Sequence, residues 1–193
     1  MDEQSKKGKL LSSFTDYVEL FVIAICIVLI LFSMVFRTCT VDGDSMNKTL
    51  NSGEVIIVSD AFYAPKRGDI VVFHMTDDSG NPNNNKPLVK RVIGVGGDTV
   101  EIEYQGNQQM TVTVTDKDGK VTELVEEYVY LDPQRNAIGS VKKVKVPEGQ
   151  VYVLGDNRNN SKDSRMIGCI DERTILGKAI VRVSPISKFG LIG

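Results

Sequence analysis

The feature that most constrains this chain is an uninterrupted apolar run near its N-terminus, residues 20–36 (LFVIAICIVLILFSMVF). The run has no charged residue, and Ser33 is its one polar member. At about 1.5 Å per helical residue it reaches about 26 Å, close to the thickness of a membrane's hydrocarbon core. A buried core helix would carry a polar stripe, and a cleavable signal peptide would be shorter and followed by small residues. We therefore predict an uncleaved membrane anchor over residues 18–37, preceded by a tail over residues 1–17.

The charges around the anchor predict its orientation. More basic residues precede the run than closely follow it: Lys6, Lys7 and Lys9 against Arg37 and Lys48. Because basic residues accumulate on the cytoplasmic side of a membrane helix, this bias favours a cytoplasmic N-terminus. Residues 38–193 would then form an extracytoplasmic domain at the plasma membrane.

The rest of the chain has the pattern of β-structure. Asp118-Gly119 is typical of a hairpin turn, and residues 81–87 (NPNNNKP) are typical of an exposed loop. We predict a mainly β domain with a hairpin-rich insertion at about residues 104–146. Short apolar or alternating runs, bounded by Gly, Pro, Asn and Asp, predict strands at residues 54–58, 69–73, 88–93, 99–104, 111–115, 120–125, 151–154 and 177–183.

Composition excludes several classes of function. His74 is the one histidine, which excludes HExxH zinc proteases and histidine-rich metal centres. The three cysteines form no CxxC pair, so we expect no structural zinc site. Cys39 and Cys169 could meet in the fold, but we favour free thiols. With 23 basic and 25 acidic residues, the chain is not a strongly basic nucleic-acid-binding domain. We expect no metal, no cofactor and no nucleic-acid partner.

Two segments are rich in polar side chains. Residues 41–50 (VDGDSMNKTL) follow the anchor, and Ser45 within them is either a turn serine or a nucleophile. Residues 151–165 (VYVLGDNRNNSKDSR) begin as a strand and end in a loop crowded with short polar groups. Such a loop is densely hydrogen-bonded, in either a structural or an active-site role.

Lys90 stands in a predicted strand, within residues 88–98 (LVKRVIGVGGD). Alternate side chains of a strand share a face, so Lys90 shares its face with Leu88 and Val92. Burial there would lower the pKa of the ammonium group, and the neutral amine would be a general base. A lysine at an exposed strand edge is the alternative.

Taken together and in this order, these segments resemble the type I signal peptidases of peptidase family S26. Those are membrane-bound Ser/Lys proteases that remove signal peptides from exported proteins. The resemblance extends over nearly the whole chain: the anchor, the Ser-Met pair at 45–46, RGD and an apolar strand at 67–73, KRVIG at 90–94, and GDNR with SxDSR at 155–165. It implies a signal-peptidase-like (LexA-like) β-domain that cuts after small residues at Ala-x-Ala sites.

The resemblance also implies a role for each matching residue. Ser45 is expected to be the nucleophile and Lys90 the general base. Ser161 is expected to orient the lysine amine, while Asp163 and Arg165 form an ion pair that braces the site.

Oxyanion and substrate binding are expected at Gly43, Asp44 and Met46, with backbone N–H groups, chiefly that of the nucleophile, as donors. Two residues depart from the family pattern. Lys48 and Gly96 stand where these peptidases usually have proline. Both are turn-shaping positions, so the departures concern loop rigidity and not the catalytic groups.

The implied partners are the signal peptides of preproteins, which would enter as an added β-strand, together with membrane lipid and, as a candidate, the secretion translocase. Three other functions were weighed. A self-cleaving LexA-like repressor would need a DNA-binding domain in place of the anchor. A non-enzymatic tethered β-domain would have no use for Ser45 and Lys90. A sortase-like transpeptidase would need histidine and arginine placed around Cys39 or Cys169, and that pattern is not found.

Overall fold

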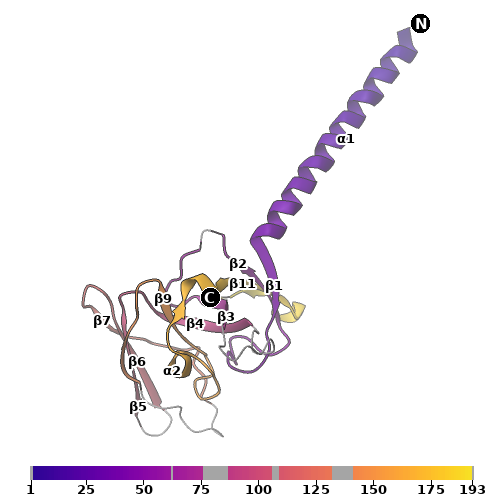
Figure 1. Cartoon of the computed structure of the whole chain (residues 1–193). Coiled ribbons are helices and arrows are strands. Elements are labelled where there is room, and N and C mark those ends of the chain that lie inside the picture. The colour runs from indigo at the N-terminus through magenta and orange to yellow at the C-terminus, as the bar shows by residue number, and fades with distance from the viewer. Residues whose placement is uncertain (1, 62, 76–86, 106–108, 132–140, 193) are drawn as a thin grey trace. The chain divides into compact units, whose positions relative to one another are not determined.

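The computed structural model describes residues 2–61, 63–75, 87–105, 109–131 and 141–192. The chain divides into two compact units, Met1–Arg37 and Thr38–Gly193. The first unit is helical and the second is mainly β. Figure 1 labels the elements used below.

The first unit is built on helix α1 (Asp2–Val35), which includes one candidate membrane span, Thr15–Ser33. Side chains in the span are exposed to the surroundings, and those of residues 20–32 are all apolar, as expected of a helix that faces lipid. The hydroxyl of Ser33 donates to the carbonyl oxygen of Ile30 at 2.8 Å, so the one polar group of the apolar run is satisfied within the helix. The helix also includes the segment predicted as a tail, and it ends where β1 begins.

The second unit contains an eight-stranded sheet in the order β1-β2-β11-β3-β4-β9-β10, with β12 paired to β11. Each strand pair from β2 to β10, and the pair of β11 with β12, is antiparallel. Within the described residues, three short helices lie in the connections: α2 (Ser164–Ile167), η2 (Glu172–Thr174) and η3 (Ile186–Lys188). The strands are β1 (Phe36–Thr40), β2 (Val55–Ser59), β3 (Ile70–His74), β4 (Pro87–Val95), β9 (Gln150–Leu154), β10 (Ile170–Asp171), β11 (Ile175–Ser184) and β12 (Gly190–Leu191).

A second sheet has four antiparallel strands in the order β7-β6-β5-β8. They are β5 (Thr99–Gln105), β6 (Gln109–Thr115), β7 (Val121–Glu123) and β8 (Val141–Lys145). The predicted hairpin is confirmed: β6 pairs with β7 across a turn in which Gly119 has a φ of 82°. The carboxylate of Asp116 accepts from the backbone N–H groups of Asp118 and Lys120, both at 2.9 Å, and closes this turn.

Apolar clusters hold the sheets and the loop after β1 in place. One cluster joins β2, β3 and β11 to Val41, Met46 and Leu50, which flank Ser45 in the chain. A second cluster joins β4 and β9 to the strands of the second sheet. Full burial of a side chain such as Met46 or Leu50 contributes about 1.5–3 kcal/mol, so the segment around Ser45 is anchored from both sides.

Strand β4 lies between β3 and β9, and apolar clusters cover both of its faces. Its residues from Val89 to Gly94 are therefore all buried, whichever face they occupy. This is why the two charged residues in the middle of the strand, Lys90 and Arg91, are both excluded from water. Of the two alternatives left open for Lys90, the structure shows the buried one, and it shows Arg91 buried on the other face.

Each of the eight predicted runs overlaps a strand, with ends shifted by one or a few residues. Strands β1, β8, β10 and β12 were not predicted, because β1 and β8 carry polar and charged residues and the other two are only two residues long. The predicted loop at residues 81–87 lies outside the described residues apart from Pro87, which begins β4. The predicted insertion contains β6, β7 and β8, and its residues 106–108 and 132–140 lie outside the described residues.

Candidate active site

Ser45 lies in a tight turn between β1 and β2. The carbonyl oxygen of Asp44 accepts from the N–H of Asn47 at 3.1 Å, and that of Met46 accepts from the N–H of Leu50 at 2.8 Å. Because Met46 and Leu50 are buried in the core, the turn holds Ser45 at the surface of the domain, half-buried.

Lys90 approaches Ser45 from the middle of β4, where it pairs with Val71 of β3. Its Nζ atom lies 2.7 Å from Oγ of Ser45 and donates to the carbonyl oxygen of Val89 at 2.8 Å. The side chain is 2% exposed. Ser45 and Lys90, predicted as nucleophile and base, are thus in hydrogen-bond contact.

Burial lowers the pKa of Lys90 to about 8, because an ammonium group loses its hydration inside the domain. Asp163 and Asp156 act in the opposite direction and raise the pKa of Lys90, by a smaller amount. Each of these carboxylates is paired with an arginine, which limits its attraction for the ammonium group. A substantial fraction of Lys90 is therefore neutral near pH 8, whereas an ordinary lysine is almost fully protonated there.

Asp163 and Arg165 form the predicted ion pair at the start of α2. Nε and Nη2 of Arg165 lie 2.8 Å and 2.7 Å from the two carboxylate oxygens. The carboxylate also accepts from the N–H of Gly155 at 3.0 Å and caps α2 through the N–H of Arg165 at 3.3 Å. Arg165 donates in addition to the hydroxyl of Tyr104 at 3.0 Å, so the pair ties the loop to the second sheet.

Ser161 is buried in the same loop, and its Oγ has no hydrogen-bond partner among the described residues. The predicted contact with the amine of Lys90 is not formed in this structure, so the orienting role of Ser161 stays a prediction. The loop is nevertheless packed closely against the nucleophile turn. A Cβ atom added to Gly155 would lie 2.2 Å from Oγ of Ser161 and 2.5 Å from the carbonyl oxygen of Ser45.

The three residues predicted for oxyanion and substrate binding have different surroundings. Gly43 is exposed, has a φ of 89° and donates its N–H to the hydroxyl of Ser52 at 3.2 Å. Asp44 is exposed, and its carbonyl oxygen accepts from the side-chain amide of Asn157 at 3.0 Å. The side chain of Met46 is 1% exposed and belongs to the core, so it serves to anchor the turn.

The two departures from the family pattern have local explanations. Lys48 has a φ of 72°, a conformation that the proline ring cannot adopt. Gly96 lies against another turn, and a Cβ atom there would be 3.0 Å from the Cα of Glu148. Both turns therefore have geometries that suit the residues present.

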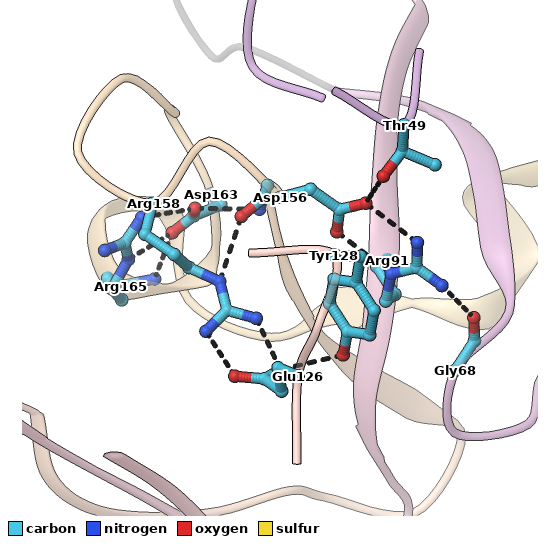
Figure 2. A network of polar contacts seen from close by, with 10 residues as sticks. Thr49, Gly68, Arg91, Glu126, Tyr128, Asp156, Arg158, Asp163 and Arg165 are labelled. Atoms are coloured by element: carbon cyan, nitrogen blue, oxygen red, sulfur yellow. Dashed lines mark hydrogen bonds and ion pairs between the residues drawn. The ribbon is translucent and has the colours of Figure 1, made fainter. Parts of the chain in front are cut away.

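Figure 2 shows a network of charged groups that contains the Asp163–Arg165 pair together with contacts that the sequence did not predict. Two nitrogens of Arg91 lie 2.9 Å and 2.8 Å from the carboxylate oxygens of Asp156, which also accepts from the hydroxyl of Thr49 at 2.6 Å. The third nitrogen of Arg91 donates to the carbonyl oxygen of Gly68 at 2.9 Å. Arg91 comes directly after Lys90 in the chain, and Thr49 comes four positions after Ser45. The network therefore links the segment that carries Lys90 to the segment that carries Ser45.

A second buried ion pair joins Glu126 and Arg158. Arg158 also donates to the carbonyl oxygen of Gly155 at 3.1 Å. Glu126 lies in a stretch with no recognisable motif, so the sequence had no signal for it. Among the described residues, no group of three or more His, Cys, Asp or Glu side chains is placed to hold a metal ion.

The sequence as a whole matches the family described as signal peptidase, peptidase S26, over residues 14–184. The chain belongs to this family. Its members are membrane-anchored serine peptidases that remove signal peptides, so the chain is a hydrolase of this kind. The apolar helix α1 is the candidate anchor.

Two individual relatives agree with this assignment. A probable signal peptidase I-1 from Synechocystis sp. is 34% identical over 183 residues, which cover 92% of this chain and 86% of the relative. A signal peptidase IB from Staphylococcus aureus (strain COL) is 35% identical over 182 residues, which cover 86% of this chain and 87% of the relative. A crystal structure of a signal peptidase I from Enterococcus faecalis V583 has 28% identity and a TM-score of 0.44, covering 60% of this chain and 97% of that chain.

Proposed function

We propose that this signal peptidase cleaves preproteins after Ala-x-Ala sites with Ser45 as nucleophile and Lys90 as general base. The observation that carries the proposal is the 2.7 Å separation of Nζ of Lys90 and Oγ of Ser45, together with the burial of the lysine. A serine hydroxyl is a weak nucleophile unless a neighbouring base accepts its proton. A lysine with a pKa of about 8 can do so near neutral pH.

In the first half of the reaction, Oγ of Ser45 transfers its proton to Nζ of Lys90 and attacks the carbonyl carbon of the scissile bond. The carbonyl oxygen becomes an oxyanion. The Lys90 ammonium group then gives its proton to the amide nitrogen, the C–N bond breaks, and the mature protein leaves with a new amino terminus. The signal peptide remains as an ester on Ser45.

In the second half, a water molecule gives a proton to the neutral Lys90, and its oxygen adds to the ester carbon. The bond to Oγ of Ser45 then breaks, and the serine recovers its proton from Lys90. The signal peptide leaves with a free carboxyl group. Lys90 ends the cycle neutral, as it began.

The contacts of Lys90 suit these transfers. A neutral amine has two N–H groups and one lone pair. If one N–H donates to the carbonyl oxygen of Val89, the lone pair is free to accept the proton of Ser45. Ser161 has a buried hydroxyl with no partner among the described residues. Although this structure does not form the contact, we assign that hydroxyl as the acceptor of the second N–H, the orienting role expected from the resemblance.

The backbone N–H of Ser45 is the favoured oxyanion donor. Among the described residues it donates to no backbone carbonyl oxygen. Asn157 supports its position by donating its own N–H to the carbonyl oxygen of Ser45 at 3.0 Å. The positive φ of Gly43 shapes the turn that presents the backbone N–H of Ser45.

For the whole chain we propose a tail over residues 1–17, an anchor over 18–37 and a catalytic domain over 38–193. The N-terminus would be cytoplasmic and the catalytic domain extracytoplasmic, in contact with membrane lipid and the secretion translocase. Protease added outside intact cells should then degrade the catalytic domain and leave the tail intact. Protection of the catalytic domain would reverse this topology.

The proposed specificity and nucleophile are tested together with a purified precursor that carries an Ala-x-Ala site. The full chain in detergent should cut after the second alanine, as mass spectrometry of the products would show. Ser45→Ala should abolish cleavage, whereas Ser187→Ala, an exposed serine in η3, should retain it. Turnover by Ser45→Ala within tenfold of the wild-type rate would contradict the assignment.

A further inference from the structure

Residues 126–131 connect β7 to a part of the chain outside the described residues, and they contact the loop that begins at Gly155. The carboxylate of Glu126 is paired with the guanidinium group of Arg158, with Nη1 2.6 Å from Oε2 and a second contact between Nη2 and Oε1. The side chains of Arg158 and Glu126 are 0% and 7% exposed. A buried bidentate pair of this kind fixes direction as well as distance. The hydroxyl of Tyr128 donates to the same carboxylate at 2.8 Å (Figure 2).

The backbone of this segment also pairs with the loop. Tyr130 donates its N–H to the carbonyl oxygen of Asp156 at 2.8 Å and accepts from the N–H of Arg158 at 2.9 Å. This is a parallel bridge between Tyr130 and Asn157. Asn157 in turn donates its backbone N–H to the carbonyl oxygen of Ser45. Asn157 therefore links residues 126–131 to the backbone of Ser45.

Two aromatic rings extend the contact to the other catalytic segments. Cζ of Arg91, the neighbour of Lys90, lies 3.8 Å from the ring centre of Tyr128. Nζ of Lys48, in the nucleophile turn, lies 4.7 Å from the ring centre of Tyr130. Both distances are typical of a cation held over an aromatic face. The segment thus contacts the chain next to Ser45, next to Lys90 and in the loop that leads to Asp163.

We propose that residues 126–131 are a brace that holds the three catalytic segments in register, and that Glu126 is its positioning residue. This inference rests on the Ser45/Lys90 dyad proposed above. Glu126 does not touch the reacting atoms. It acts through Arg158 and Asn157 on the position of Ser45. Small errors in such a position are costly, since a displacement of about 1 Å can reduce a rate by about a hundredfold.

The first test is kinetic and uses the full chain in detergent with the Ala-x-Ala precursor. Glu126→Gln keeps the size of the side chain and removes its charge. We expect kcat to fall by at least about tenfold with KM within about twofold, because the brace positions the dyad and does not bind substrate. Glu123→Gln, at an exposed position in β7 outside the brace, is the matched control and should leave both constants unchanged. A kcat for folded Glu126→Gln within twofold of wild type would overturn the proposal.

The second test needs no activity. In the Ser45→Ala background, hydrogen exchange at the amides of Asn157 and Arg158 should become faster when Glu126→Gln is added. Amides of β3, which lie outside the brace contacts, should not change. Unaltered exchange at Asn157 and Arg158 would overturn the brace. Cleavage by Ser45→Ala would instead overturn the dyad, so the two failures are distinguishable.

A double variant covers the case in which Glu126→Gln does not fold. Glu126→Leu with Arg158→Met removes both buried charges, which proteins tolerate better than the loss of one partner. This variant should fold and still show the fall in kcat. Wild-type kcat in the double variant would overturn the positioning role.

Discussion

The Nζ atom of Lys90 and the Oγ atom of Ser45, 45 positions apart in the chain, lie 2.7 Å from each other. The contact forms because β4 is an inner strand that buries its lysine, while Met46 and Leu50 anchor the nucleophile turn in an apolar cluster that also contains Val89 of β4. A lysine in this position is costly to bury as an ammonium group and useful as a neutral amine. Stability and chemistry therefore both depend on its protonation.

Replacing Lys90 with methionine should stabilise the domain at neutral pH while abolishing cleavage. The pKa of Lys90 falls from an ordinary 10.5 to about 8 on folding, and each unit corresponds to about 1.4 kcal/mol. Allowing for the lost hydrogen bonds, we expect the free energy of unfolding of Lys90→Met at pH 7 to exceed that of wild type by about 1–3 kcal/mol. Urea unfolding of the full chain in detergent measures the difference.

The sign of the pH dependence follows from the same values. Between pH 8 and pH 10.5 the unfolded chain binds the Lys90 proton and the folded chain has released it. The stability of the wild type should therefore rise with pH across this interval, and the advantage of Lys90→Met should disappear above it. Lys162→Met, at an exposed position in the catalytic loop, is the control. Lower stability of Lys90→Met at pH 7 would contradict a buried ammonium group.

Asp163→Asn should shift the pH dependence of cleavage to lower pH. The negative charge of Asp163 raises the pKa of Lys90, so its removal lowers that pKa further. The unpaired guanidinium of Arg165 acts in the same direction. Loss of the buried pair should also cost about 3–5 kcal/mol of stability. The pH profile of kcat/KM measures the shift, with Asp171→Asn in an exposed pair as the control. A shift of the kcat/KM profile of Asp163→Asn to higher pH would contradict the proposed effect of Asp163 on Lys90.

Gly155→Ala should damage the site without adding any charge. Its Cβ atom would lie 2.5 Å from the carbonyl oxygen of Ser45 and 2.2 Å from Oγ of Ser161, so the two loops must separate. We expect a loss of about 1–3 kcal/mol in stability and of about a hundredfold in kcat. In Gly190→Ala no atom lies within 4 Å of the added carbon, so this variant should change neither the stability nor kcat. Wild-type kcat in Gly155→Ala would show that the loops tolerate separation.

Alternation of apolar and polar residues predicts most of the fold because strands of a half-buried sheet carry that pattern directly. It fails for β8 (VKKVK), where three lysines hide the pattern, and for two-residue strands, which are too short to show one. Alternation also placed Lys90 among apolar neighbours. It puts Arg91 on the opposite face with Val89 and Ile93, and it does not tell which face is buried; the sheet order shows that both faces of β4 are covered.

In the site, too, local contacts could be predicted from the sequence and long-range contacts could not. Asp163 and Arg165 are two positions apart, so their pairing is local and readable from the motif. Glu126 and Arg158 are 32 positions apart, and Thr49 and Asp156 are 107 apart, so both contacts depend on how the strands are ordered. Glu126 stands in an ordinary polar stretch and carries no sign of burial. Long-range polar contacts of this kind need the structure to be seen.

The most direct test of the Ser45/Lys90 dyad is the pH profile of kcat/KM on a peptide with an Ala-x-Ala site, measured for wild type and Lys90→Arg. Because Lys90 must be neutral to accept the serine proton, the wild-type value should rise with pH and level off above a midpoint near 8. Lys90→Arg should be nearly inactive throughout, since a guanidinium group stays protonated. A profile that is flat from pH 5 to pH 9, or an active Lys90→Arg enzyme, would contradict Lys90 as the general base.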